Sequence, residues 1–347
     1  MSTVLARMFA SRLFWPVIML LVLFLINVIA FPGFFAITIR DGNLYGSLVD
    51  ILRNGAPTMI IAVGMTLVIA TRGIDLSVGA VCAIAGAVAC SILLGSPDPA
   101  NPGTVAVAIV AAILAGLVCG LWNGFLVSVL GIQPIIATLV LMTAGRGIAM
   151  LITEGQILTV TSPPFKALGA GFWLGIPIAV YIAAFVFLFA VLITRRTALG
   201  MFIESVGINP EASRQAGVRA RGPLFAVYTF CALCAAIAGL VLTANTMAAD
   251  ANNAGLFIEL DAILAVVIGG TSLAGGRYSL AGTLVGALVI QTLVTTVYTV
   301  GIPPIATMVF KAAVVTVVCL LQSPTTNEAL GSFRRRISVR AGKAVSA

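Results

Sequence analysis

Apolar runs of about twenty residues follow one another along most of this chain. A run of that length spans the hydrocarbon core of a bilayer as an α-helix. Only 9% of the 347 residues are charged, against about 25% in a soluble domain, so an ordinary wetted surface is excluded. We therefore predict an all-α integral membrane protein, a polytopic bundle of about ten transmembrane helices, some of them broken or re-entrant. The expected spans are 13–31, 51–70, 76–95, 104–122, 133–153, 175–194, 222–247, 257–271, 280–300 and 302–321.

The positions of the basic residues predict the topology. Most of them lie in the loop 195–221 and in the tail after residue 322, which face the cytoplasm if the positive-inside rule holds. The expected outer loops carry mainly acidic residues, with Arg40 and Lys166 as the exceptions. We predict one transmembrane domain over 1–321, a basic cytoplasmic tail over 322–347, and both termini in the cytoplasm. Topology explains the net charge of +8, so no nucleic-acid partner is expected.

Several enzyme classes are excluded by residue types that the sequence lacks. It contains no histidine, and its six cysteines all lie within apolar stretches, where they are interpreted as small packing residues. We expect no metal and no cofactor in this chain. A phosphate-binding loop of the form G-x-x-x-x-G-K-[ST] does not occur, so the chain is not expected to hydrolyse ATP itself.

Polar side chains within or beside the spans are candidates for a substrate path, because such groups are costly in a bilayer. Lys311 and Gln291 are isolated intramembrane polar residues. Arg146 requires a partner at its depth, and Glu259 or Asp261 is the expected one, either as a structural ion pair or beside the substrate. The candidate path residues are Asp75, Asn123, Arg146, Asp250, Asn252, Asn253 and Asp261.

Two of these groups allow a structural interpretation as readily as a functional one. The segment 72–77 either is a broken helix whose carboxylate lines a path, or is a short loop in which Asp75 or Ser77 caps the next helix while Arg72 meets lipid phosphate. The carboxylate and amides of 250–253 suit a polyhydroxylated ligand. The same residue types also favour a plain turn.

The loop 195–221 contains signals for a short helix on the cytoplasmic side. Asn209 is a suitable N-cap, Pro210 suits the first helical position, and Gly217 suits the end. A capped helix at this place is expected to dock a partner, although a solvated linker is the alternative.

The same loop resembles the coupling segment of permeases from ATP-driven sugar importers of the ribose, arabinose and galactofuranose type, with Ser205 and Ser213 where that family usually has alanine. Further similar stretches are 64–79, 120–124, 133–147 and 268–277. Within the family, 248–256 and 259–268 are most similar to galactofuranose importer permeases, whereas Arg72 departs from the small residue expected there. The resemblance assigns ATPase coupling to Gly200, Glu204, Gly207, Asn209, Ala212 and Gly217.

What the resemblance implies is a multi-pass permease in a bacterial inner membrane that translocates a monosaccharide, with galactofuranose as the candidate. It also implies an ATP-binding subunit dimer that uses the ATP, a periplasmic sugar-binding protein, a second permease copy or sister permease, and contact with membrane lipid. The alternatives are a secondary transporter or facilitator that works without ATP, and a structural membrane subunit.

Overall fold

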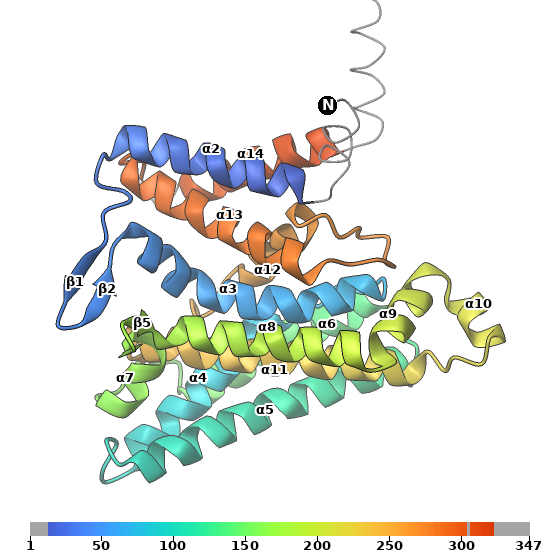
Figure 1. Cartoon of the computed structure of the whole chain (residues 1–347). Helices are drawn as coiled ribbons and strands as arrows, with labels where there is room; N and C mark the ends of the chain where they lie inside the picture. Colours follow the sequence, from blue (N-terminus) through green and yellow to red (C-terminus); the bar gives the residue numbers. More distant parts are fainter. Residues whose placement is uncertain (1–12, 304–305, 323–347) are drawn as a thin grey trace, which may run out of the picture.

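The computed structural model describes residues 13–303 and 306–322, and these form a bundle of α-helices with short strand pairs at one end (Figure 1). Of the expected basic tail, only Gln322 lies within this range. The helices are α2 Phe14–Ala30, α3 Ser47–Ala70, α4 Val78–Gly95, α5 Pro102–Ser128, α6 Pro134–Ile152, α7 Pro163–Ala170, α8 Ile178–Arg196, α9 Leu199–Ile208, α10 Pro210–Gln215, α11 Arg221–Thr246, α12 Ile258–Ile268, α13 Leu280–Thr299 and α14 Thr307–Gln322.

Each of the ten predicted spans overlaps one of these helices, which confirms the fold class. In the part of the chain that the structure describes, seven helices are long and apolar enough to cross a membrane, namely α3, α4, α5, α6, α8, α11 and α13. The other three are shorter, with 17 residues in α2, 16 in α14 and 11 in α12. The count of ten is therefore approximate, and α12 is the shortest of these ten helices.

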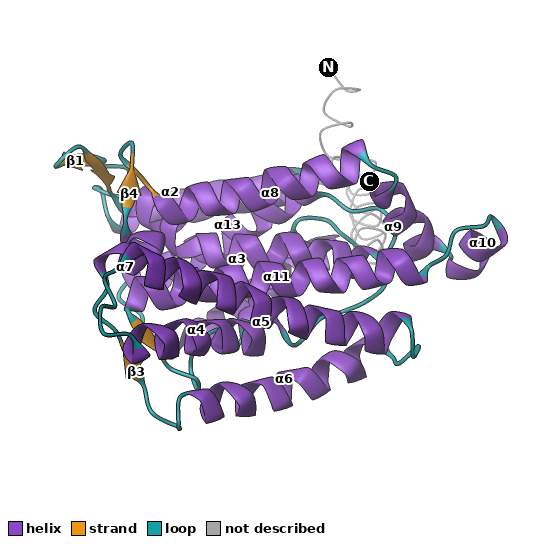
Figure 2. Cartoon of the chain, turned by 90° about the horizontal axis from the view of Figure 1, so that it is seen from below, coloured by secondary structure: helices purple, strands orange, loops and turns teal. Residues whose placement is uncertain are grey.

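From α3 to α11, successive long helices run in alternating directions between two ends of the bundle, and α13 then runs in the same direction as α11 (Figures 1 and 2). We call one end the α10 end, because α9 and α10 lie there. The opposite end, here the β1 end, carries α7 and two short antiparallel pairs, β1 Thr38–Arg40 with β2 Asn43–Tyr45 and β4 Phe172–Trp173 with β5 Ile176–Pro177. A third pair joins β3 Leu158–Thr159 to β6 Ala248–Ala249. The two ends therefore present different elements to partners.

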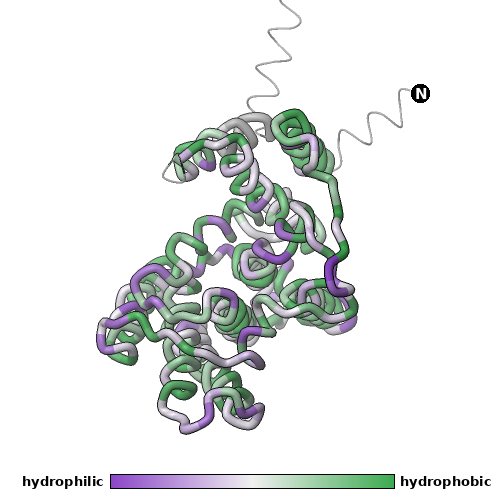
Figure 3. The backbone as a smooth tube through the Cα atoms, turned by 90° about the vertical axis from the view of Figure 1, so that its left-hand side faces the viewer, coloured by the Kyte–Doolittle hydropathy of each residue, from purple (hydrophilic) through white to green (hydrophobic). Residues whose placement is uncertain are grey.

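The centre of the bundle is formed by α3, α4 and α11, which are the most buried of the long helices. Small residues let these helices approach closely. A Cβ at Gly239 of α11 would lie 2.5 Å from the carbonyl oxygen of Cys82 in α4, and one at Gly64 of α3 would lie 2.9 Å from Cys231 in α11. Hydrophobic residues make up most of the helix lengths, with hydrophilic residues in short stretches (Figure 3).

The cysteines behave as the sequence predicted where they are described. Cys82, Cys90, Cys119, Cys231 and Cys234 are buried and free, and all five belong to the apolar core. The side chain of Cys319 lies outside the described set. These thiols serve as small packing groups between helices.

Candidate functional site

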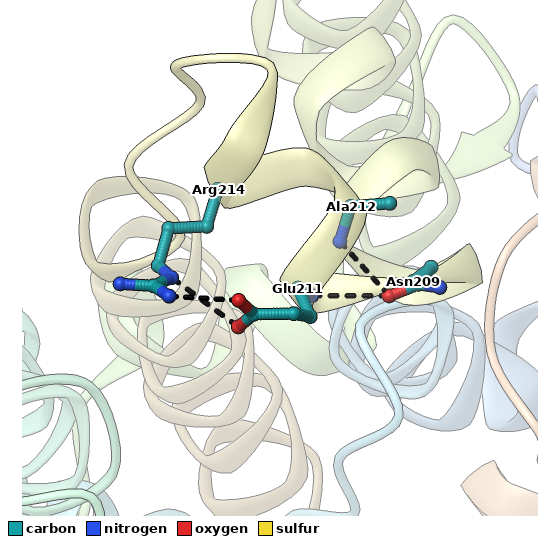
Figure 4. A network of polar contacts seen from close by, with 4 residues as sticks. All are labelled: Asn209, Glu211, Ala212 and Arg214. Carbon is teal, nitrogen blue, oxygen red and sulfur yellow. Dashed lines mark hydrogen bonds and ion pairs between the residues drawn. The ribbon is translucent and has the colours of Figure 1, made fainter.

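The helix predicted in the loop 195–221 is present and is closed at both of its ends. The side-chain oxygen of Asn209 accepts hydrogen bonds from the backbone nitrogens of Glu211, at 3.1 Å, and Ala212, at 3.0 Å (Figure 4). Beyond its last residue, Gly217 adopts a φ of +84° and donates to the carbonyl of Arg214 at 3.0 Å. Glu211, Ala212 and Arg214 are exposed at the tip of the α10 end. The helix is confirmed, and its docking role stays a prediction.

A second helix, α9, precedes it, and the sequence analysis did not predict it. Leu199, Phe202, Ile203 and Val206 follow the i, i+3, i+4, i+7 spacing of an amphipathic helix, and that signal was available. A cavity of about 570 Å³ separates part of α9 from α8 and from the start of α13. The cavity is lined by Phe187, Val191, Thr194, Arg195, Gly200, Met201, Glu204, Tyr278, Ser279, Leu280 and Ala281.

The lining of the cavity includes two charged residues of the loop 195–221. They are Arg195, from α8, and Glu204, from α9, and Tyr278 from the loop before α13 also lines the cavity. Burial raises the pKa of Tyr278 above its ordinary value, and a hydrogen bond to Thr194 partly opposes that rise. Gly200 is buried at the bend from α8 to α9, where a Cβ would overlap the carbonyl of Thr194.

The last turn of α9 lies directly on the end of α3. A Cβ at Gly207 would overlap the carbonyl oxygen of Ala70 and lie 2.6 Å from the nitrogen of Gly276. The Gly276 nitrogen donates to that same Ala70 oxygen at 2.8 Å. Arg72 extends from the end of α3 and donates from Nε to the carbonyl of Gly207 at 2.6 Å, and from Nη2 to the carbonyl of Ile208. Arg72 thus makes two contacts inside the protein while the residue stays exposed, and its expected contact with lipid phosphate stays a prediction.

Asp75 and Asn123 meet in a buried polar cluster between α3, α4 and α5. Asp75 Oδ1 accepts from the nitrogen of Ser77 at 2.9 Å and from its hydroxyl at 2.6 Å. Asn123 Nδ2 donates to the same hydroxyl at 2.9 Å. Asp75 Oδ2, Asn123 Oδ1 and Tyr228 Oη are buried with no hydrogen-bond partner. Asp75 thus shapes the turn that begins α4, while half of its carboxylate stays unsatisfied.

Arg146 does not pair with Glu259 or Asp261, so that expectation was wrong. Its Nη1 donates instead to the carbonyls of Ala251, at 2.9 Å, and Ala254, at 2.7 Å. The segment between α11 and α12 is not helical, so its carbonyls need donors that a helix would supply internally. Arg146 supplies them.

Asp261 pairs with Lys311, which the sequence analysis had treated as isolated. Lys311 Nζ lies 2.8 and 2.6 Å from the two carboxylate oxygens, and the two side chains are 20% and 21% exposed. This ion pair fastens α14 to α12. It satisfies both charges locally, so neither group needs a substrate for neutralisation.

The residues of 250–253 form a turn by themselves. Asp250 Oδ1 accepts from the backbone nitrogens of Asn252 and Asn253, and Oδ2 accepts from the Asn253 side chain at 2.7 Å. The hydrogen bond from Asn253 holds the pKa of Asp250 below its ordinary value. The geometry fits the plain-turn interpretation.

The structure therefore distributes the candidate path residues over three separate places. Asp75 and Asn123 lie together, Arg146 lies with the 250–253 turn, and Asp261 lies with α14. Their substrate roles remain predictions. The coupling residues, in contrast, are gathered at the α10 end, where they follow one another along α9, α10 and the turn after α10.

Comparison with known proteins matches residues 47–319 to the family described as the permease component of the branched-chain amino acid transport system. The chain belongs to this family and is a permease component of a transport system.

Three relatives match over most of the chain. It is 48% identical over 317 residues, 90% of this chain and 91% of the relative, to the galactofuranose transporter permease protein YtfT of Escherichia coli. It is 43% identical to the fructose import permease protein FruF of Bifidobacterium longum, with 98% and 96% covered, and 39% identical to the ribose import permease protein RbsC of Escherichia coli, with 88% and 92% covered. No solved structure matches the chain significantly.

Proposed function

We propose that this chain is the permease subunit of an ATP-binding-cassette importer that carries a monosaccharide into a bacterial cell, with galactofuranose as the first candidate. The single observation behind the sugar is the 48% identity to a galactofuranose permease over 90% of the chain. Fructose and ribose are the next candidates, because relatives named for them also match over most of their length. ATP is used by a separate subunit dimer.

The α10 end is the side that would receive the ATP-binding subunits. This end carries a preformed, exposed helix. It also carries five basic residues, as the positive-inside rule requires of a cytoplasmic end, namely Arg195, Arg196, Arg214, Arg219 and Arg221. The β1 end would then face a periplasmic sugar-binding protein. A second permease, identical or a sister, would complete the translocation unit.

Uptake into proteoliposomes tests the proposal. The chain is reconstituted with its cognate ATP-binding subunit, with ATP inside and the binding protein outside, and supplied with labelled galactofuranose, fructose, ribose, arabinose or leucine. We expect galactofuranose uptake that requires all three proteins and ATP. Uptake by the chain alone, independent of ATP, would make it a facilitator and refute the proposal. Uptake of leucine instead of a sugar would refute the assignment of a monosaccharide as the substrate.

The docking role is tested by charge reversal at two exposed or half-exposed carboxylates. Glu204→Arg, in α9, is expected to prevent co-purification of the ATP-binding subunit, while Glu154→Arg, at the β1 end, is the matched control and should retain it. The orientation is tested with Ala212→Cys and Asn252→Cys, both exposed. An impermeant maleimide added outside intact cells should label only the second.

A further inference from the structure

Three segments that are distant in the sequence meet at the end of α3. They are the last residues of α9, the residues that follow α3, and the loop 269–279 between α12 and α13. The backbone bond from Gly276 to Ala70 joins the loop to α3, and Gly207 packs against both partners of that bond. The element that would receive the ATP-binding subunit therefore rests on the central helix without an intervening layer.

Arg72 holds this junction from the α3 side. Carbonyls in the last turn of a helix have no partner within it, and the guanidinium satisfies two successive ones, those of Gly207 and Ile208. The planar guanidinium suits such a two-point contact better than an ammonium does. The next residue along the chain, Asn209, is the cap of α10. The contact thus fixes the base of the exposed helix.

The backbone geometry is specialised for this contact. Arg72 has a φ of +64°, a conformation that residues other than glycine adopt rarely. Gly275 has a φ of +82°, and a Cβ there would overlap the Arg72 side chain. Two features of the backbone, one on each side of the contact, thus act together to place one guanidinium.

The same short connection continues into the buried polar cluster. Gly73 follows Arg72, and a Cβ at Gly73 would overlap Tyr228 Oη. Asp75 lies two residues further on. Unpaired polar atoms are rare in protein interiors, yet Asp75 Oδ2, Asn123 Oδ1 and Tyr228 Oη are all unpaired here. A change in the position of 72–75 would alter the surroundings of all three.

We propose that Arg72 is a positioning residue that transmits movement of α9 and α10 to the segment 73–77 and to the buried polar cluster of Asp75, Asn123 and Tyr228. The inference rests on the proposed function, in which ATP-binding subunits displace the α10 end. The movement would pass through the two hydrogen bonds of the Arg72 guanidinium and then along the backbone of 72–75 to the Asp75 carboxylate.

The test measures sugar imported per ATP hydrolysed in the reconstituted complex, using galactofuranose or whichever panel sugar the wild type imports. In Arg72→Ala we expect this ratio to fall about tenfold, within the usual range of coupling between sites, while ATP hydrolysis continues. Arg72→Lys should give an intermediate ratio, because an ammonium can replace one of the two contacts. Thr71→Ala is the matched control, since its hydroxyl donates only to Val68 in its own helix, and it should keep the wild-type ratio.

The outcomes distinguish a role of Arg72 in transmitting movement from a merely structural role. A partial loss of assembled complex would lower uptake and hydrolysis together without changing their ratio. A wild-type ratio in Arg72→Ala complex that has assembled overturns the inference. An equal fall in Thr71→Ala also overturns it. If Arg72→Ala does not assemble, Arg72→Lys decides by the same ratio. A wild-type complex that imports no sugar refutes the proposed function itself, which is a different result from a wild type that imports and a variant that remains coupled.

Discussion

The ion pair between Lys311 and Asp261 gives a quantitative test of how α14 is held. Both side chains are about four-fifths covered within the chain, and Nζ contacts both carboxylate oxygens. Removing one partner of such a pair leaves an uncompensated charge, which costs about 3 kcal/mol or more. Replacing both partners with neutral groups costs little. Lys311→Met and Asp261→Asn should each lower the free energy of unfolding by about 3 kcal/mol, close to a hundredfold in the equilibrium constant, and the double variant by about 1 kcal/mol.

The measurement is reversible unfolding in mixed micelles of increasing SDS fraction, followed by circular dichroism. The chain supplies its own control in the exposed pair of Arg214 with Glu211, whose side chains are 75% and 61% exposed. A cycle of Arg214→Met and Glu211→Gln should give a coupling of about 0.5 kcal/mol or less, since exposed pairs contribute little. Additive effects of the Lys311 and Asp261 substitutions would refute the reasoning, because they would mean that neither charge depends on the other.

Three further predictions follow from local geometry. In Gly207→Ala, the new Cβ would lie 2.6 Å from the Gly276 nitrogen, and the two segments must separate toward the 3.4 Å of ordinary contact. The free energy of unfolding should fall by about 1–3 kcal/mol, which is seen as a lower midpoint of thermal unfolding in detergent. An unchanged midpoint would contradict the close packing. Asn209→Ala removes the α10 cap and should speed hydrogen exchange at Glu211 and its neighbour, at a cost of about 1 kcal/mol, whereas Asn252→Ala should not. The pKa of Asp250 is lowered in the folded state. The Asp250 carboxylate should therefore stabilise the 250–253 turn fully above the ordinary carboxyl pKa of about 4, and this stabilisation should be lost as the pH falls through the lower folded pKa. Chemical shifts of the turn that titrate near 4 would contradict this prediction.

The long helices were predictable because hydropathy acts over about twenty residues and needs no knowledge of neighbours. The α10 cap was predictable for the opposite reason, since Asn209, Pro210 and Gly217 act within one or two turns. Both signals are contained in the local sequence. The ten expected segments and the capped helix accordingly appear where the sequence placed them.

Partners between distant segments were not predictable in the same way. Arg146 was expected to pair with a carboxylate, because a buried charge usually needs an opposite one. Instead it donates to two backbone carbonyls of an irregular segment. Asp261 was given to a substrate path, although Lys311, 50 positions later, neutralises it. The role of Arg72 depends on a left-handed backbone and on glycines over 200 residues away, which no local pattern reports.

The closure of α10 at both ends affects how fast and how selectively a partner can bind there. A six-residue helix is far too short to persist alone, yet the Asn209 cap and the Gly217 turn hold it before any partner arrives. An incoming subunit would therefore meet a rigid shape, with little ordering entropy lost on contact. Encounter rates should then differ little among competing ATP-binding subunits. Discrimination between them would be expressed in how long each complex lasts.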